Sequence, residues 1–227
     1  MKETFCLDNH PSIERLIYEK GWLQLGDVEK VKAIYNFVSN DILFGYNKED
    51  YRLASLILKD GYGQCNTKAI LLMDLLRYCH IECRLHGATV DKALQKGILS
   101  GIIYHLSPQE IIHSWVEVFI QGNWYVCEGV ILDKNYLLAI QNRYPQKIKF
   151  CGYAVAVKNL QTVDVNWSLN DTYIQKEALV KDLGIYKTPD DFYQNYHQNI
   201  NILKRWVYQH IVRHWMNHKV KKLRGGK

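Results

Sequence analysis

The stretch DGYGQCNTKAILLMDLLRYCHIECR, residues 60–84, places a cysteine directly behind two glycines and a glutamine, at the start of an apolar helical pattern. A structural cysteine normally lies inside such a pattern, where neighbouring side chains pack around it. Cys65 lies at its edge. From Asn66 to Tyr78 the apolar residues cover a face too broad for a surface helix, which predicts a central, buried helix.

A cysteine at a helix N-terminus lies in the partial positive charge of unpaired backbone amides, which favours thiolate over thiol. Cys65 is therefore a candidate nucleophile. Gly61 and Gly63 allow a tight turn and leave room for a substrate chain, while the Cys65 amide and the Gln64 side chain could face a developing oxyanion. On these residues alone, the alternative is that the glycines end one helix and Cys65 is a small residue that begins the next.

The best candidate for a partner base among the nine histidines is His113. It begins a predicted strand in HSWVEV, just after a predicted loop over residues 91–109. The segment IIHSWVEVFIQGNWYVCEGVILD has two runs rich in Val, Ile and Trp, which predicts a β-hairpin hinged near residues 121–123. A histidine held by a sheet at the edge of a site can activate a thiol.

A thiolate–imidazolium pair needs a third group that fixes the orientation of the ring. Because side chains alternate along strands, Glu128 on the second strand faces the same way as His113. A turn at residues 122–123 would not put these two side chains opposite each other, so their contact requires a bulge or an earlier turn. Glu117 and Asp133 remain alternatives for the same role.

Three motifs together resemble a known family. The segment GYGQCNTKAILLMDLLRYCHIECRLHG, followed by HSWVEVFIQGNWYVCEG, is similar to the core of the transglutaminase-like superfamily. That pattern is a Gly-x-Gly-x-Cys turn opening a helix, then a strand, then H-x-W-V-E-V and a tryptophan with an acidic residue shortly after it. The upstream VKAIYNFVSNDILF also resembles the helix that precedes this core, so the resemblance spans about residues 27–133.

The resemblance implies a papain-like fold and a Cys-His-Asp triad that transfers an acyl group to water or to an amine. Carried over, Cys65 is the nucleophile and His113 is the general base and acid. The third position falls on Glu128, where the family usually has aspartate. The longer carboxylate could still reach the ring, or the triad could be impaired.

The order of helices, then strands, then helices predicts an α+β fold. We expect a transglutaminase-like core over residues 1–160, with N-terminal helices and the buried catalytic helix packed on an antiparallel sheet. Residues 161–227 are expected to form a helical extension with a basic tail. Within it, DTYIQKEALVKDLGIY and the segment from Thr188 to Val220 are predicted helical, the second with Pro189 in its first turn.

Composition limits the partners and the location. The net charge is +6, and five of these charges come from Lys219, Lys221, Lys222, Arg224 and Lys227, which weakens a nucleic-acid function. This tail is expected to be a solvated, frayed terminus. The first residues lack an apolar signal core and no apolar run approaches membrane-spanning length, so a cytoplasmic protein with six reduced cysteines is expected. The C-terminal helix could cap the core or pair with a second copy.

Two histidine groups raise a metal-binding alternative. Cys79, His80, Cys83 and His86 are close in sequence, but an alternating strand sends neighbours to opposite faces, so these cysteines are expected in the core and no metal is expected. His210, His214 and His218 recur every fourth residue and are expected on a partly exposed helix face. Trp115 could line a substrate groove, although tryptophans on hairpin strands more often belong to the core.

These expectations combine into a cysteine-dependent acyl transfer on an amide of a peptide or protein, through a thioester and without a cofactor. Hydrolysis is favoured over transamidation, because the chain lacks the extra domains of animal transglutaminases. The alternative is a catalytically impaired transglutaminase-like module that serves as a binding or scaffolding domain.

Overall fold

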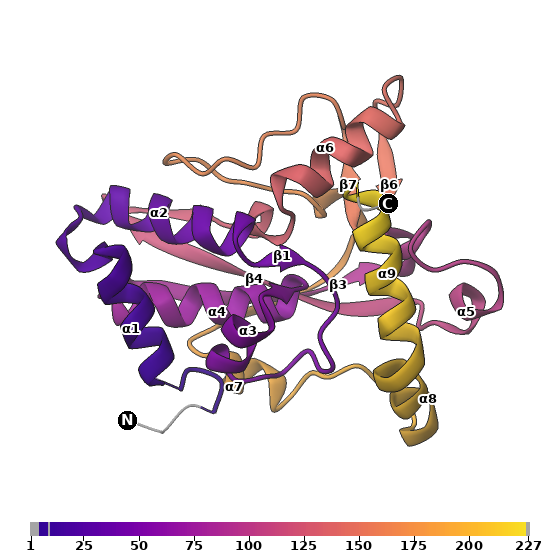
Figure 1. Ribbon diagram of the computed structural model, residues 1–227, viewed down its shortest axis with the longest axis horizontal. Coiled ribbons are helices and arrows are strands. Elements are labelled where there is room, and N and C mark those ends of the chain that lie inside the picture. The colour runs from indigo at the N-terminus through magenta and orange to yellow at the C-terminus, as the bar shows by residue number, and fades with distance from the viewer. Residues whose placement is uncertain (1–4, 9, 226–227) are drawn as a thin grey trace.

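The helices of the N-terminal half surround one central helix. The computed structural model describes residues 5–8 and 10–225 (Figure 1). The first elements are α1 (Pro11–Lys20), η1 (Trp22–Gln24), α2 (Asp27–Asn40), α3 (Ala54–Asp60) and α4 (Cys65–Tyr78). Every residue of α4 from Asn66 to Leu76 is buried. The helix packs against α2 and α3 on one side and against the main sheet on the other, as its broad apolar face predicted.

The main sheet is antiparallel and has the strand order β5-β4-β3-β8. Its strands are β3 (Cys83–Asp91), β4 (Glu110–Ile120), β5 (Asn123–Val126) and β8 (Leu179–Tyr186). Two small sheets pair β1 (Leu43–Phe44) with β2 (Tyr62–Gly63) and β6 (Phe150–Gly152) with β7 (Val155–Val157). Helices on an antiparallel sheet give the transglutaminase-like α+β fold that the sequence predicted.

The hairpin is present, and its turn lies within the predicted hinge at residues 121–123. Ile120 pairs with Asn123, so Gln121 and Gly122 form a two-residue turn, and both have positive φ angles, 52° and 82°. This backbone twist suits the twist of the flanking strands. The second strand then ends at Val126, and the 3-10 helix η3 (Glu128–Ile131) follows at once.

Two segments differ from the sequence prediction. DTYIQKEALVKDLGIY was predicted helical and contains the 3-10 turn η4 (Lys176–Ala178) and strand β8, which pairs with β3. As an edge strand that is mostly exposed, β8 has no buried face to impose an alternating pattern on its sequence. The predicted loop over residues 91–109 contains η2 (Lys92–Gln95) and α5 (Gly101–Leu106).

The C-terminal elements run along one side of the molecule. Helix α7 (Pro189–Tyr193) has Pro189 in its first turn, as predicted, and Thr188 caps it. After it, α8 (Ile202–Val207), a π-helical turn (Tyr208–Val212) and α9 (Arg213–Leu223) form the yellow column in Figure 1. Met216 and Val220 are buried, and α9 packs against α6 (Lys134–Arg143). The last helix therefore caps its own chain.

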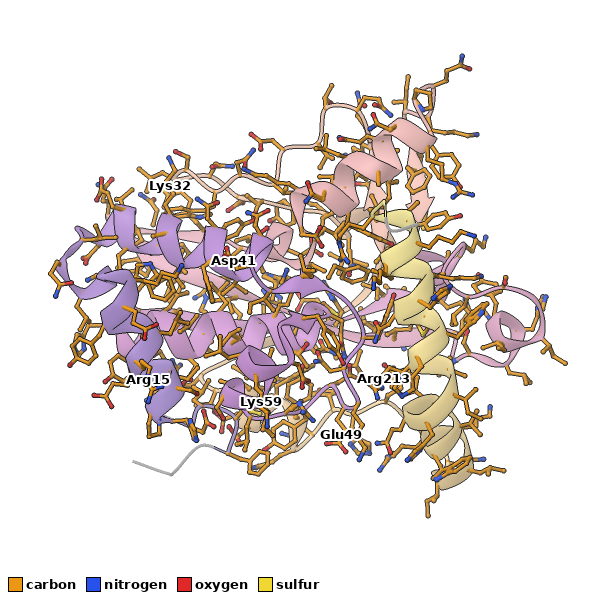
Figure 2. All side chains as sticks on the ribbon, viewed as in Figure 1. Arg15, Lys32, Asp41, Glu49, Lys59 and Arg213 are labelled. Carbon is orange, nitrogen blue, oxygen red and sulfur yellow. The ribbon has the colours of Figure 1, made fainter. Side chains whose placement is uncertain are left out.

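The basic tail is only partly solvated. Arg224 forms an ion pair with the buried Asp133 at 2.7 Å, so the expected frayed terminus is wrong at this residue. Lys227 lies outside the described residues. Charged side chains gather instead on the outer surfaces of the helices and loops, where Arg15, Lys32, Asp41 and Lys59 are exposed (Figure 2). Among the residues that the structure describes, no helix combines the length and apolarity needed to span a membrane.

Candidate active site

The turn before α4 brings a short strand directly onto the first turn of the helix. Gly61 ends α3 with φ of 70°, a left-handed conformation that favours glycine. At Gly63 a Cβ atom would come within 2.7 Å of Thr67 Oγ1, so a side chain there would collide with the helix. The backbone amide of Gln64 donates to the same Thr67 hydroxyl at 3.0 Å. This packing fixes Cys65 as the first residue of α4, with its thiol partly exposed.

Asn66 fastens the start of α4 to β4 on both sides of His113. Its Nδ2 donates to the Ile112 carbonyl at 3.1 Å, and its Oδ1 accepts from the Ser114 hydroxyl at 3.1 Å. The Asn66 side chain is buried, so these bonds form away from water, where they stabilise a single arrangement. Asn66 was missed by the sequence analysis, although a polar residue beside the cysteine in an otherwise apolar pattern was a signal for it.

His113 and Glu128 form a buried pair. His113 Nε2 lies 2.9 Å from Glu128 Oε1, and both side chains are at most 1% exposed. The second oxygen, Oε2, accepts from the backbone amides of Ile174 at 2.8 Å and Gln175 at 3.1 Å. The carboxylate is therefore held by the backbone on one side and holds the imidazole ring on the other.

Glu128 reaches the ring from η3 and not from the second strand of the hairpin. Buried Lys68, one turn along α4 from Cys65, holds the end of η3 by donating to the Ile131 carbonyl at 3.0 Å and also donates to the Ser39 carbonyl at 3.1 Å. Burial lowers the pKa of Lys68 to about 7. The helix that carries the thiol thus also positions the turn that carries the carboxylate.

The remaining ring nitrogen of His113 is available to the thiol. Nδ1 is buried and has no hydrogen-bond partner among the described residues. Burial lowers the pKa of His113, but the Cys65 sulfur and the Glu128 carboxylate outweigh burial and raise it above its ordinary value. Because Nε2 contacts Glu128, Nδ1 is the ring nitrogen without a hydrogen-bond partner among the described residues.

The two rival carboxylates lie elsewhere. Glu117 binds Arg84 at 2.6 Å and His86 at 2.7 Å. Asp133 binds Arg224 and accepts from the backbone amide of Phe44 at 2.9 Å. The structure therefore places Glu128, and neither of these alternatives, against His113.

The other predicted site residues are placed differently. The Gln64 Nε2 donates to Asp50 at 2.9 Å, and its Oε1 accepts from the Asn47 amide at 2.8 Å, so this side chain borders the site while holding the neighbouring loop. Trp115 is buried and stacks on His86 with ring centroids 4.3 Å apart. It packs at 5.4 Å from the His113 ring and does not belong to the lining of the pocket at Cys65, among the described residues.

A pocket of about 410 Å³ opens at Cys65. Gln64, Cys65 and Asn66 line it, together with Asp50 and Gln175. Burial raises the pKa of Asp50. A pocket of this size beside a thiol with an imidazole behind it can hold a substrate carbonyl against the sulfur.

The whole chain was then compared with known proteins. Residues 17–129 match the family model described as the transglutaminase-like superfamily. Over these residues the chain belongs to that superfamily. A solved structure named "Putative Cysteine Protease from Cytophaga hutchinsonii" is 22% identical with a TM-score of 0.38, and the match covers 51% of this chain and 35% of that one. This chain thus spans about a third of that protein's length. No curated protein matches the chain.

Side chains of the two groups weighed as metal sites contact other residues instead. His86 bonds Glu117 at 2.7 Å and Asp182 at 2.9 Å, while Cys79 and Cys83 are buried in the apolar core. His210 stacks on Trp206 at the exposed C-terminal column. Within residues 5–8 and 10–225, no cluster of three or more His, Cys, Asp or Glu side chains is arranged to hold a metal ion.

Proposed function

We propose that the protein is a cysteine-dependent acyl-transfer enzyme that cleaves an amide of a peptide or protein. The observation that carries the proposal is the buried His113–Glu128 pair, whose Nδ1 has no hydrogen-bond partner in the described part of the chain, together with a thiol that lines a pocket. This is the arrangement of nucleophile, base and orienting carboxylate that acyl transfer requires.

The proposed reaction has two halves. His113 Nδ1 takes the thiol proton, and the Cys65 sulfur attacks the substrate carbonyl, whose oxygen gains the negative charge. The unpaired amides at the start of α4, beginning with that of Cys65, face this charge. His113 then gives its proton to the departing amine, which leaves a thioester on Cys65.

In the second half, His113 takes a proton from the acyl acceptor, which attacks the thioester. When the resulting tetrahedral intermediate collapses, His113 returns the proton to the Cys65 sulfur and the product is released. Water is the proposed acceptor, since it needs no second binding site, and the product is then a carboxylic acid. An amine acceptor would instead give a new amide by the same steps.

The test is to trap the acyl-enzyme and identify the product. A panel of fluorogenic peptide amides is incubated with the protein with and without a primary amine, and mass spectrometry follows both the protein and the product. We expect a thioester adduct on the peptide containing Cys65, a carboxylic acid product, and no adduct or turnover in Cys65→Ala. Activated esters are tested in the same way. If no amide and no activated ester forms an adduct on Cys65, the binding-module alternative is favoured.

A further inference from the structure

The pocket beyond Cys65 is walled by aliphatic side chains from several elements. They come from η2 and the residues after it, α5, β4 and the C-terminal column, and include Leu94, Leu99, Ile103, Ile111, Val207 and Met216. Its volume of about 410 Å³ suits a ligand-sized group. The partly exposed Cys65 lines the same pocket.

Few charged side chains line the pocket. Among the described residues that line it, only Asp50 and Lys204 are charged. Asp50 accepts from Gln64, the residue beside Cys65, at 2.9 Å, while Lys204 is exposed and lies 3.4 Å from the Leu106 carbonyl. Away from Asp50 and Lys204, a charged substrate group would lose its water without gaining an oppositely charged partner among the described lining residues, whereas an apolar group would gain about 25 cal/mol per Å² buried.

The C-terminal wall of the pocket is held by specific bonds and is not a loose apolar patch. Asn217 on α9 bonds both the amide and the carbonyl of Tyr46, at 2.7 and 3.0 Å. The Tyr208 hydroxyl donates to the Asn47 carbonyl at 3.2 Å, and Arg213 donates to the Tyr62 hydroxyl at 3.1 Å. Arg213 is labelled at the C-terminal column in Figure 2. This wall lies beyond residues 17–129, the part that matches the superfamily.

We propose that this pocket selects substrates with a large aromatic or branched aliphatic side chain on the acyl side of the amide. The inference rests on the proposed function and names its substrate class. The acyl group is bonded to Cys65 from the formation of the thioester until the acceptor releases it, whereas the amine leaves in the first half. A pocket that Cys65 itself lines therefore suits the acyl side.

The first test measures the pocket without requiring turnover. Cys65 is alkylated with iodoacetamide and with its N-hexyl derivative, and site-resolved mass spectrometry compares each rate with that at exposed Cys151. We expect the hexyl reagent to favour Cys65 over Cys151 by at least about tenfold more than iodoacetamide does. Equal ratios for the two reagents would overturn the proposal.

Matched variants locate the effect. Ile103→Asp and Val207→Asp put a charge on the lining, whereas Ile102→Asp and Ile211→Asp change exposed neighbours that do not line the pocket. We expect the two lining variants to lose the preference for the hexyl reagent and the two neighbours to keep it. Equal loss in both pairs would contradict an apolar binding site at the lining.

The second test uses matched peptide amides that carry Phe or Asp immediately on the acyl side, or on the amine side, of the reporter bond. We expect kcat/KM to be at least about tenfold higher for Phe on the acyl side, with little effect on the amine side. A preference on the amine side alone would overturn the assignment. If no amide is cleaved but the alkylation preference persists, the proposed function fails while the apolar selectivity of the pocket stands.

Discussion

The Glu128 carboxylate has two separate tasks. Oε1 contacts the His113 ring, while Oε2 accepts from the amides of Ile174 and Gln175. An aspartate at this position would be one methylene shorter and could not make all three contacts without moving η3. The departure from the usual aspartate is therefore matched by the local backbone, and the longer side chain reaches the ring.

Glu128→Gln tests the orienting role at this residue. The Gln amide can still accept from the backbone through Oε1, but its NH₂ group would face His113 Nε2, so the ring would carry its proton on Nδ1 and could not accept one from Cys65. We expect kcat/KM to fall about 10²–10⁴-fold while the fold persists. The measurement is steady-state cleavage of the preferred amide, with thermal unfolding as a fold check.

Glu117→Gln is the matched control, because Glu117 is a buried carboxylate that pairs with His86 and not with His113. It should change kcat/KM much less. Comparable losses in the two variants would contradict a special role for Glu128.

At the residue scale, the sequence identified the His113–Glu128 pair but not the way these two side chains meet. Alternation put Glu128 on the right face of a hairpin strand, yet the strand ends at Val126 and the contact is made from η3. No local pattern could predict this, since η3 is fixed by Lys68 and by backbone pairing with Thr172. The same limit applies to Asn66, whose bonds to β4 bridge residues far apart in sequence.

Among the elements, those with a strongly one-sided or fully apolar pattern were predictable. The helix expected upstream in VKAIYNFVSNDILF is part of α2, and the predicted buried helix is α4. Strand β8 was not predictable from the sequence. Its side chains are mostly exposed, and its position is decided by pairing with β3, about a hundred residues earlier. Its residues 179–186 join the sheet built by residues 83–126.

The docking of α9 can be tested by one substitution. Asn217→Ala removes both bonds to the Tyr46 backbone and leaves these backbone groups without their partner. We expect a loss of about 1–3 kcal/mol in the free energy of unfolding, measured by urea denaturation. The matched control is His218→Ala, the next residue on the same helix, whose side chain is exposed. Similar losses in both variants would show that the two bonds do not anchor the helix.

For the whole molecule, Asp74 makes stability depend on pH. Its side chain is buried within α4, and Oδ2 has no hydrogen-bond partner in the described part of the chain. Burial, and secondarily Asp8, raises the pKa of Asp74 from 3.8 to about 7. Between these values the folded protein holds a proton that the unfolded chain loses, so this contribution to stability is complete below about pH 4 and is lost as the pH rises to about 7.

Asp74→Asn removes the charge and should therefore flatten this part of the pH profile. We expect the variant to gain a few kcal/mol over wild type at pH 8, on the order of 1.4 kcal/mol per pKa unit, and much less at pH 4. Urea unfolding from pH 4 to pH 8 gives the comparison. Asp41→Asn, at the exposed residue labelled in Figure 2, is the control and should leave the profile unchanged. A gain that is the same at both pH values would contradict titration of Asp74.

The central claim is that Cys65 is activated by His113, and the most direct test is the rate of Cys65 alkylation at pH 6. With iodoacetamide and site-resolved mass spectrometry, exposed Cys151 in the same molecule serves as the reference thiol. We predict that Cys65 reacts at least about tenfold faster than Cys151, and that His113→Ala removes the difference while the protein stays folded. Equal rates at the two cysteines in the wild type, or an excess at Cys65 that survives in His113→Ala, would contradict the account.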